Sequence, residues 1–467
     1  MSSEHQENLT AIKLITSAIG SIASAVDNMS ARLTAVENLS RNIQQTINMV
    51  AQRSLHGRRP VRCLFLVHNV ESWDAYADIY DAMLKADDFK PSVATVNRWL
   101  AGPRGQYKDE HINHDELTRL NVPHIRLNMP NSYEGLDIIK ALKPDIIFRQ
   151  APWEGTLPPG FAARELNFAR LCYVPYGFMT VRRYVTAEIP DAADRNLQTD
   201  QTFHRLCWRI FCETEMHKEM FRKTAVRGAD NVICSGYPKF DRLLQAKNRP
   251  PFWPIPAQDE KRRFRLIWAP HHSVESAWLN FATFPEMHQD MLAWARATTD
   301  FDIVLKPHPS LFDKLIDTQT MTQQSLNVFL DEWKSLPNTA LVEGADYGPL
   351  FCGSDAMLTD GISFIFEYPL FEKPLIFLDN GRNVGFNEAG AVGVEAANTV
   401  KTFAEARALC EHLRLGEPDP KAGVRNKVLS LIHPYPNQSV RKILDSIREG
   451  LNQDENLEYQ QINLRSP

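Results

Sequence analysis

The sequence lacks the features that define several classes of protein. It contains no C-x-x-C pair, and its seven cysteines are scattered through apolar stretches such as "RLCYV" and "NVICSG". This distribution predicts reduced, buried thiols and argues against a metal site built from cysteine. No apolar run approaches the roughly 20 residues that cross a bilayer, and the start, "MSSEHQENLT", does not resemble a secretion signal. We expect a cytoplasmic protein whose contact with membrane would be peripheral, at the inner face of the cytoplasmic membrane.

An excess of one charge is also absent. The 52 Lys and Arg residues nearly balance the 57 Asp and Glu residues, which gives a net charge of -5. We therefore predict no nucleic-acid partner, because such proteins usually carry a basic face. The sequence has no G-x-x-x-x-G-K, no G-x-G-x-x-G after its first strand and no H-E-x-x-H. These absences argue against an ATPase, a dehydrogenase and a metalloprotease, and they predict chemistry without a metal or a cofactor.

Apolar residues recur at alternating steps of three and four near the N-terminus. The series is Ile12, Ile15, Ile19, Ile22, Val26, Met29, Leu33, Val36, Ser40, Ile43, Ile47 and Val50, and Ser40 is its one polar member. This spacing predicts a coiled coil in residues 1–57, and the isoleucines favour a homo-oligomer, a trimer or tetramer, through residues 8–52. One alternative is a helix packed on its own domain. Another is an interfacial membrane helix, which the shortage of Lys and Arg disfavours.

Short apolar strands then alternate with helical patterns, which predicts an α/β protein with two doubly wound, Rossmann-like domains that face a cleft. The first half (58–246) contains the strands "VRCLFLVHN", "PSVATVN", "LKPDIIFRQ", "RLCYVPYG", "RIFCET" and "NVICSG". The second half (263–448) contains "RLIWAP", "FDIVLKPHP", "ALVEG", "DAMLTD" and "KPLIFL". A linker rich in proline and charge (247–262) separates them, and residues 449–467 form a tail. Ligands of such sheets bind beyond the carboxyl ends of the strands.

Three polar loops follow strands of the second half. They are "APHHSVE" (269–275), "KPHP" (306–309) and "TDGIS" (359–363), and a helix is predicted from Ser363 to Phe371. The candidate phosphate ligands are His271, His272, Lys306, His308, Thr359, Asp360, Gly361 and Ser363. Imidazole, ammonium and hydroxyl donors beside a helix start suit the pyrophosphate of a nucleotide donor. Each loop alone is most simply structural, but three at one sheet edge favour a binding site.

Three segments resemble the signature segments of a known family. They are "KPHP", "DYGPLFCGSDAMLTDGISFIFEYPLFEKPLIF" and "CSGYPKFDRLL". They are similar to those of the CDP-glycerol glycerophosphotransferase family, the teichoic-acid polymerases and their capsule-polymerase relatives. The resemblance spans residues 61–446 and implies the GT-B fold. It also implies that a group moves from a cytidine nucleotide donor to a growing envelope polymer.

The resemblance also implies roles for individual residues. His308 and Ser363 would contact the donor phosphates, Asp360 would shape the turn, and Glu367 would lie on the same helix. Tyr176 stands where these polymerases carry the histidine of a His-Gly pair, the base of the reaction. The candidate bases are therefore Glu154, beside Trp153, then His68 and then Tyr176, because a phenol with a pKa near ~10 is a weak base at neutral pH.

The leading interpretation is a GT-B transferase that moves a glycerophosphate, polyol-phosphate or sugar unit from a nucleotide-activated donor, CDP-linked as the first guess. The acceptor would be a polysaccharide, a lipid-linked chain or a teichoic-acid-like polymer. One alternative is a nucleotide-sugar glycosyltransferase of capsule or lipopolysaccharide synthesis. Another is a non-catalytic coiled-coil scaffold with a degenerate GT-B domain, which the tyrosine at position 176 favours.

Overall fold

The structure is a computed structural model that describes residues 3–53, 59–100, 106–181, 198–257, 262–275, 279–344 and 346–452. The chain divides into two compact units. One comprises Met1–Arg59 with Asn167–Ala169, and the other comprises Pro60–Leu166 with Arg170–Pro467. Each unit is described by itself.

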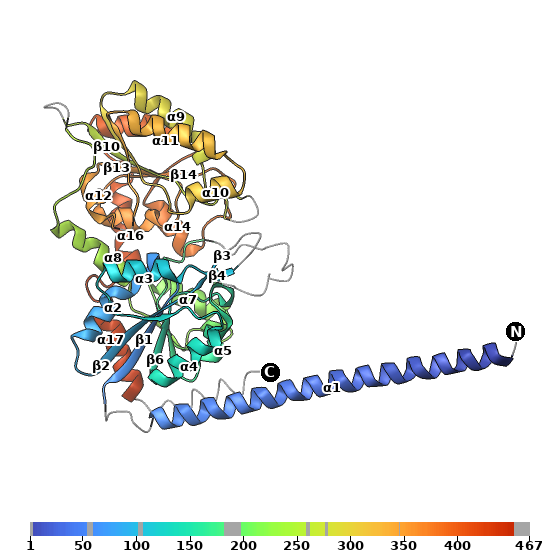
Figure 1. Ribbon diagram of the computed structural model, residues 1–467. Helices are drawn as coiled ribbons and strands as arrows, with labels where there is room; N and C mark the ends of the chain where they lie inside the picture. Colours follow the sequence, from blue (N-terminus) through green and yellow to red (C-terminus); the bar gives the residue numbers. More distant parts are fainter. Residues whose placement is uncertain are drawn as a thin grey trace. The chain divides into compact units, whose positions relative to one another are not determined.

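A single long helix, α1 (Ser3–Arg53), makes up most of the first unit (Figure 1). Its apolar series is open to solvent: Ile15, Ile19, Ile22, Val26, Met29, Leu33, Val36, Ile43 and Ile47 are each between 52% and 69% exposed. The predicted helix is confirmed. Its assembly into a coiled coil stays a prediction.

The first half contains a seven-stranded parallel sheet. Its strands are β1 (Val61–Val67), β2 (Phe89–Val96), β5 (Ile125–Leu127), β6 (Ile146–Arg149), β7 (Arg170–Tyr173), β8 (Cys207–Cys212) and β9 (Val232–Cys234). They lie in the order β5-β2-β1-β6-β7-β8-β9. Strand β1 lies between β2 and β6, and its residues from Cys63 to Val67 are all buried. Phe65 stacks on Phe148 of β6 with ring centroids 4.6 Å apart.

Helices cover both faces of this sheet (Figure 1). They are α2 (Asp74–Leu84), α3 (Glu110–Arg119), α4 (Ser132–Leu142), α5 (Ala163–Leu166), α6 (Thr202–Leu206), α7 (Glu215–Thr224) and α8 (Pro238–Leu244). Short 3-10 helices lie at η1 (Val70–Ser72), η2 (Glu154–Thr156), η3 (Pro159–Phe161) and η5 (Gln245–Asn248). A small hairpin of β3 (Arg98–Leu100) and β4 (Gln106–Lys108) follows β2.

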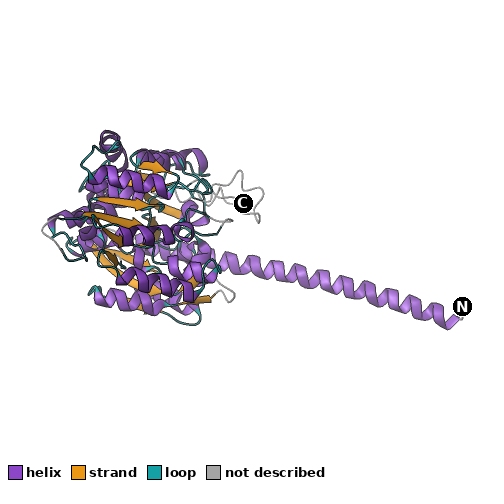
Figure 2. Cartoon of the chain, turned by 90° about the horizontal axis from the view of Figure 1, so that it is seen from above, coloured by secondary structure: helices purple, strands orange, loops and turns teal. Residues whose placement is uncertain are grey.

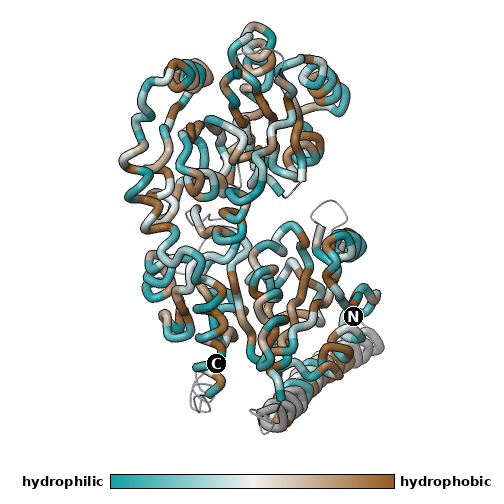
Figure 3. Tube along the Cα trace, turned by 90° about the vertical axis from the view of Figure 1, so that its left-hand side faces the viewer, coloured by the Kyte–Doolittle hydropathy of each residue, from teal (hydrophilic) through white to brown (hydrophobic). Residues whose placement is uncertain are grey.

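The second half contains a six-stranded parallel sheet, between layers of helix (Figure 2). Its strands are β10 (Phe264–Ala269), β11 (Phe301–Leu305), β12 (Thr339–Leu341), β13 (Ala356–Thr359), β14 (Leu375–Leu378) and β15 (Asn398–Val400), in the order β12-β11-β10-β13-β14-β15. Its helices are α9 (Phe284–Ala297), α10 (Leu311–Asp317), α11 (Gln323–Ser335), α12 (Gly348–Gly353), α13 (Phe364–Glu367), α14 (Glu388–Glu395), α15 (Phe403–Arg414) and α16 (Ala422–Ile432). Hydrophobic residues gather along the strands of both sheets (Figure 3).

Two predicted elements differ from the structure. The helix predicted from Ser363 to Phe371 is an α-helix only over α13 and continues as the 3-10 helix η6 (Tyr368–Phe371). Pro369 explains the break, because it cannot donate a backbone hydrogen bond. The last helix, α17 (Ser439–Asn452), runs past residue 448 and packs against α2 and α8 of the first half. The domain boundaries themselves stay predictions.

The α/β class with two doubly wound sheets is confirmed by the strand orders and by the parallel pairing of neighbouring strands in both sheets. All seven cysteines are free thiols, and six of them are buried. Within the described residues, none of the helices combines the length and the apolar character that a membrane crossing requires.

Candidate functional site

The three polar loops predicted for the second half meet at one edge of its sheet. Strands β11, β10 and β13 are neighbours in that order, and each leads into one of the loops. We call the loops, residues 269–275, 306–309 and 359–363, the three-loop cluster. The predicted convergence of polar side chains at the carboxyl ends of adjacent parallel strands is confirmed.

Three histidines form the centre of the three-loop cluster. The rings of His272 and His308 stack with their centroids 3.9 Å apart. The ring of His271 lies 4.4 Å from that of His272 and 5.5 Å from that of His308. Rings this close repel one another when charged, so the arrangement favours neutral imidazoles until an anion is present.

Hydrogen bonds assign the tautomer of two of these histidines. Nδ1 of His308 accepts from the backbone N–H of Ser310 at 3.1 Å. Nδ1 of His271 accepts from the backbone N–H of Ser273 at 3.3 Å and lies 2.8 Å from the hydroxyl of that serine. In the neutral state both histidines therefore carry their hydrogen on Nε2. Neither Nε2 has a hydrogen-bond partner among the described residues, so both N–H groups can serve a ligand.

The pKa values of the three histidines also favour their neutral forms. Burial, together with smaller effects of nearby positive groups, lowers the pKa of His308 to about 3 and that of His272 to about 4. Burial also lowers the pKa of His271 well below its usual value. All three are neutral at pH 7 in the free protein, and a bound anion would raise their pKa values by favouring the charged form.

Lys306 supplies the positive charge of the three-loop cluster. It is buried. Within the described part of the chain its Nζ contacts the ring of Tyr347, 5.7 Å from the centroid, and no carboxylate forms an ion pair with it. Burial lowers its pKa from 10.5 to about 8, which Glu343 and Glu367 partly oppose. At ~1.36 kcal/mol per pKa unit the shift corresponds to about 3 kcal/mol. An ammonium held this way is unfavourable until an anion neutralises it.

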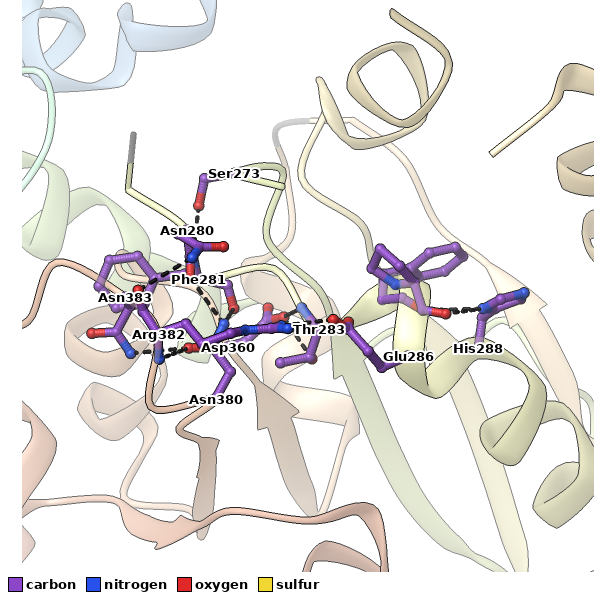
Figure 4. Close-up of polar contacts among 12 residues, drawn as sticks. Ser273, Asn280, Phe281, Thr283, Glu286, His288, Asp360, Asn380, Arg382 and Asn383 are labelled. Atoms are coloured by element: carbon purple, nitrogen blue, oxygen red, sulfur yellow. Dashed lines mark hydrogen bonds and ion pairs between the residues drawn. The ribbon is translucent and has the colours of Figure 1, made fainter. Parts of the chain in front are cut away.

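Asp360 connects two of the loops through hydrogen bonds. Its Oδ1 accepts from the backbone N–H of His271 at 2.5 Å, and its Oδ2 accepts from the backbone N–H and the hydroxyl of Thr283 at 2.6 and 2.7 Å. Figure 4 shows the carboxylate beside Thr283. Burial raises the pKa of Asp360 to about 7, and these hydrogen bonds oppose the rise. The residue ties the end of β13 to the loop after β10 and to the start of α9.

A loop after β14 braces the same region (Figure 4). The side-chain N–H of Asn380 donates to the backbone oxygens of Asn280 and Phe281 at 2.8 and 3.1 Å. Arg382 pairs with Glu286 of α9 at 2.6 Å. The backbone around the three-loop cluster is thus fixed before any ligand arrives, as preorganised binding requires.

The "TDGIS" loop contributes one exposed hydroxyl. The hydroxyl of Thr359 donates to the backbone oxygen of Ala269 at 2.6 Å and accepts from the N–H of Gly361 at 2.8 Å, so it is already engaged. Ser363 is exposed and makes no capping bond with its side chain. Because α13 has only four residues, its dipole is small, and the predicted help from a long helix is not found.

Glu367 has partners other than the histidines. Its Oε1 lies 2.8 Å from Nζ of Lys239 in the first half, and its Oε2 accepts from the hydroxyl of Tyr347 at 2.5 Å. Its predicted contact with the nucleotide stays untested. The contacts that the structure shows connect it to Lys239 of the first half and to Tyr347, whose ring also contacts Lys306.

The three candidate bases follow neighbouring strands of the first half, β1, β6 and β7. His68 comes directly after β1. The backbone N–H of His68 donates to Oε1 of Gln150 at 3.0 Å. Nδ1 of His68 is buried without a partner among the described residues. Burial, together with the charges of Arg149 and Arg98, lowers the pKa of His68 to about 3. The imidazole is therefore neutral, and with this pKa it is a weak base.

Glu154 forms an ion pair with a buried arginine. Nη1 of Arg149 lies 3.1 Å from one of its oxygens and Nη2 lies 3.3 Å from the other, and the backbone N–H of Ala163 donates at 3.1 Å. Arg149 has no exposed side-chain surface. Tyr176, by contrast, is 40% exposed. The roles of all three as bases stay predictions, but the structure gives Glu154 a second role, neutralising a buried charge.

Several residues of the site were not predicted from the sequence. Ser273 and Ser310 fix the histidine tautomers, and Thr283 and Tyr347 hold two carboxylates. A Ser or Thr two residues after a histidine was the available signal for the first pair. Among the residues that the structure describes, no group of three or more His, Cys, Asp and Glu is arranged to hold a metal ion.

Comparisons with known proteins agree with this picture. Residues 192–382 match the model of the family described as CDP-Glycerol:Poly(glycerophosphate) glycerophosphotransferase, which confirms the predicted resemblance over that part of the chain. A comparison with curated proteins gives no match.

Solved structures show the same fold. MnaA of S. aureus in complex with UDP is similar with a TM-score of 0.55 and 16% identity, over 84% of this chain and 97% of that one. UDP-GlcNAc 2-epimerase of Neisseria meningitidis bound to UDP-GlcNAc gives 0.56 and 14%, over 83% and 100%. The wall teichoic acid polymerase TagF gives 0.53 and 14%, over 89% and 98%. The GT-B class of the fold is thereby confirmed.

Proposed function

We propose that this chain, whose residues 192–382 match the glycerophosphotransferase family, transfers a polyol phosphate from a nucleotide-activated donor to a cell-surface polymer. A CDP-linked polyol such as CDP-glycerol is the proposed donor, and a teichoic-acid-like chain is the proposed acceptor. One observation carries the proposal. The three-loop cluster presents two imidazole N–H donors and a buried, unpaired ammonium at the carboxyl edge of the second sheet.

The donor pyrophosphate fits these groups. His271 and His308 would donate through Nε2 to phosphate oxygens, Lys306 would neutralise part of their charge, and Ser363 would add a hydroxyl from the exposed end of the third loop. As the acceptor oxygen forms its bond to the phosphorus that carries the polyol, the bond from that phosphorus to the CMP oxygen breaks. The same donors then stabilise the charge that grows on the leaving CMP.

The proton of the acceptor hydroxyl must move to a base in the first half. We place His68 ahead of Glu154, because both oxygens of Glu154 already bind Arg149 while Nδ1 of His68 is unpartnered within the described residues. The low pKa of His68 makes it a weak base in the free protein. A bound anionic donor would raise that pKa and make the imidazole more basic.

We also propose that α1 assembles the protein into a trimer or tetramer. Its apolar side chains are solvent-exposed at alternating steps of three and four, and a second copy of the same helix offers the matching surface. The proposed working place is the cytoplasm, at the inner face of the membrane, where a lipid-linked acceptor would be reached from the surface.

Titration of the protein with CDP, CMP and UDP tests the donor site. His308→Ala is expected to weaken CDP binding at least tenfold, because it removes one charge-assisted hydrogen bond worth ~1.5–3 kcal/mol. His111→Ala is the matched control, since His111 is an exposed histidine on α3 of the first half. Unchanged CDP affinity in His308→Ala would place the donor site elsewhere.

A further inference from the structure

A chain of polar contacts connects the first half to the three-loop cluster. It begins at Lys239 on α8, whose Nζ lies 2.8 Å from Oε1 of Glu367 on α13. The other oxygen of Glu367 accepts from the hydroxyl of Tyr347 at 2.5 Å. The ring of Tyr347 contacts two ammonium groups, with Nζ of Lys239 5.8 Å and Nζ of Lys306 5.7 Å from its centroid.

The charges of this chain of contacts do not balance. Lys239 and Lys306 are both cations, and Glu367 is the one carboxylate that bonds to either of them among the described residues. Lys239 takes that carboxylate, and the face of Tyr347 offers only a weak cation-π contact to Lys306. The uncompensated charge is therefore at Lys306, next to His308, where an anion of the phosphate class would neutralise it.

We propose that Lys239, a residue of the first half, is a positioning residue for the donor phosphate site in the second half. It acts on Lys306 through Glu367 and Tyr347. By holding Glu367 at a distance from Lys306, it leaves the Lys306 ammonium for the phosphates of a nucleoside diphosphate. This inference rests on the proposed function, because it takes the three-loop cluster to be the donor site.

The alternative arrangement shows why Lys239 matters. Glu367 already raises the pKa of Lys306, so the two charges act on each other. Without Lys239, the buried carboxylate of Glu367 would lose its cation, and an ion pair with Lys306 would compete with the ligand. With Lys239 present, Glu367 is held on both oxygens and contributes only a longer-range attraction. Tyr347 connects the two groups, because its hydroxyl binds the carboxylate of Glu367 and its ring contacts the ammonium of Lys306.

Two carboxylates, those of Glu343 and Glu367, act on the charge of Lys306. Glu343, after β12, raises its pKa, as does Glu367. His308 faces it from its own loop and is neutral in the free protein. The two carboxylates thus favour the charged ammonium, whereas burial opposes it. The pH at which nucleotide affinity declines reports directly on this balance.

The test measures the affinity for CDP, and for inorganic pyrophosphate as a probe without a base, by calorimetry between pH 6.5 and 10. In the wild type, affinity is expected to fall above pH 8 as Lys306 loses its proton. Glu367→Gln removes an attraction for the ammonium, so the decline is expected to begin at lower pH. Lys239→Met frees Glu367, so the decline moves to higher pH, while affinity at pH 7 falls roughly three- to tenfold because Glu367 now competes.

Two further variants keep the outcome interpretable. Lys239→Arg retains the charge and is expected to stay near wild type. Combining Lys239→Met with Glu367→Gln removes both charges, and it is expected to restore most of the affinity that Lys239→Met loses. A double variant as weak as Lys239→Met, or pH profiles that coincide with the wild type in all variants, would overturn the inference. Absence of binding of CDP and pyrophosphate to the wild type would instead overturn the proposed function.

Discussion

Glu154→Gln separates a structural from a catalytic role for this carboxylate. In the structure the carboxylate neutralises Arg149, which has no exposed side-chain surface, through two contacts of 3.1 and 3.3 Å. Glutamine keeps one acceptor oxygen but turns an NH2 group towards the guanidinium. Removing one partner of a buried ion pair costs ~3–5 kcal/mol, and the remaining bonds of Arg149 to the backbone oxygens of Ala151 and Phe161 reduce this to about 2–4 kcal/mol.

Differential scanning calorimetry checks the magnitude. A loss of 2–4 kcal/mol lowers the melting temperature of a domain of this size by roughly 5–10 °C. Glu134→Gln is the matched control, because Glu134 is an exposed residue on α4 of the first half, and it should leave the melting temperature unchanged. Turnover of the folded Glu154→Gln protein is expected within tenfold of wild type. A wild-type melting temperature together with a hundredfold or greater loss of turnover would show that Glu154 is the base.

Three further outcomes are expected. Light scattering should give a trimer or tetramer for the full chain and a monomer for a chain that starts at Arg59; equal subunit numbers would mean that α1 does not assemble copies. Tyr176→Phe should keep turnover within tenfold of wild type while His68→Ala loses several orders of magnitude, and the reverse would make the tyrosine catalytic. Lys306→Met should abolish CDP binding yet raise the melting temperature of the free protein. The folded state lowers the pKa of Lys306 from 10.5 to about 8, so the buried ammonium destabilises the fold at pH 7. The wild type should accordingly gain stability as pH rises from 8 to 10.5, a gain that is absent from Lys306→Met; a lower melting temperature for that variant would contradict this reasoning.

The sequence predicts the framework of this protein well because its strands are short, apolar and bounded by clear breaks. The predicted strands "DAMLTD" and "KPLIFL" contain the whole of β13 and β14, respectively. Heptad spacing likewise predicts α1. The helix after Ser363 was predicted too long, since the periodic apolar residues continue through Pro369 although the backbone hydrogen bonding changes there.

The positions of the polar loops were predicted correctly, but which of their residues bind other protein groups could not be predicted. Asp360, Thr359 and Glu367 look like ligands in the sequence, and in the structure each is engaged with protein groups. These contacts join residues such as Thr283 and Asp360 that lie 77 positions apart, or connect the two halves, as Lys239 and Glu367 do. Such pairings depend on how the sheets bring loops together, which periodicity and local motifs do not encode.

Incubation of the full-length protein with CDP-glycerol and a glycerophosphate-primed acceptor, followed by analysis of the released nucleotide, tests the central claim most directly. The proposed transfer breaks the P–O bond between the phosphorus that carries the glycerol and the bridging oxygen that leaves with CMP. We therefore expect CMP in amounts equal to the glycerophosphate added to the acceptor, and no CMP from His308→Ala. Release of CDP with transfer of glycerol alone, or turnover of a UDP-linked sugar with none of CDP-glycerol, would contradict it.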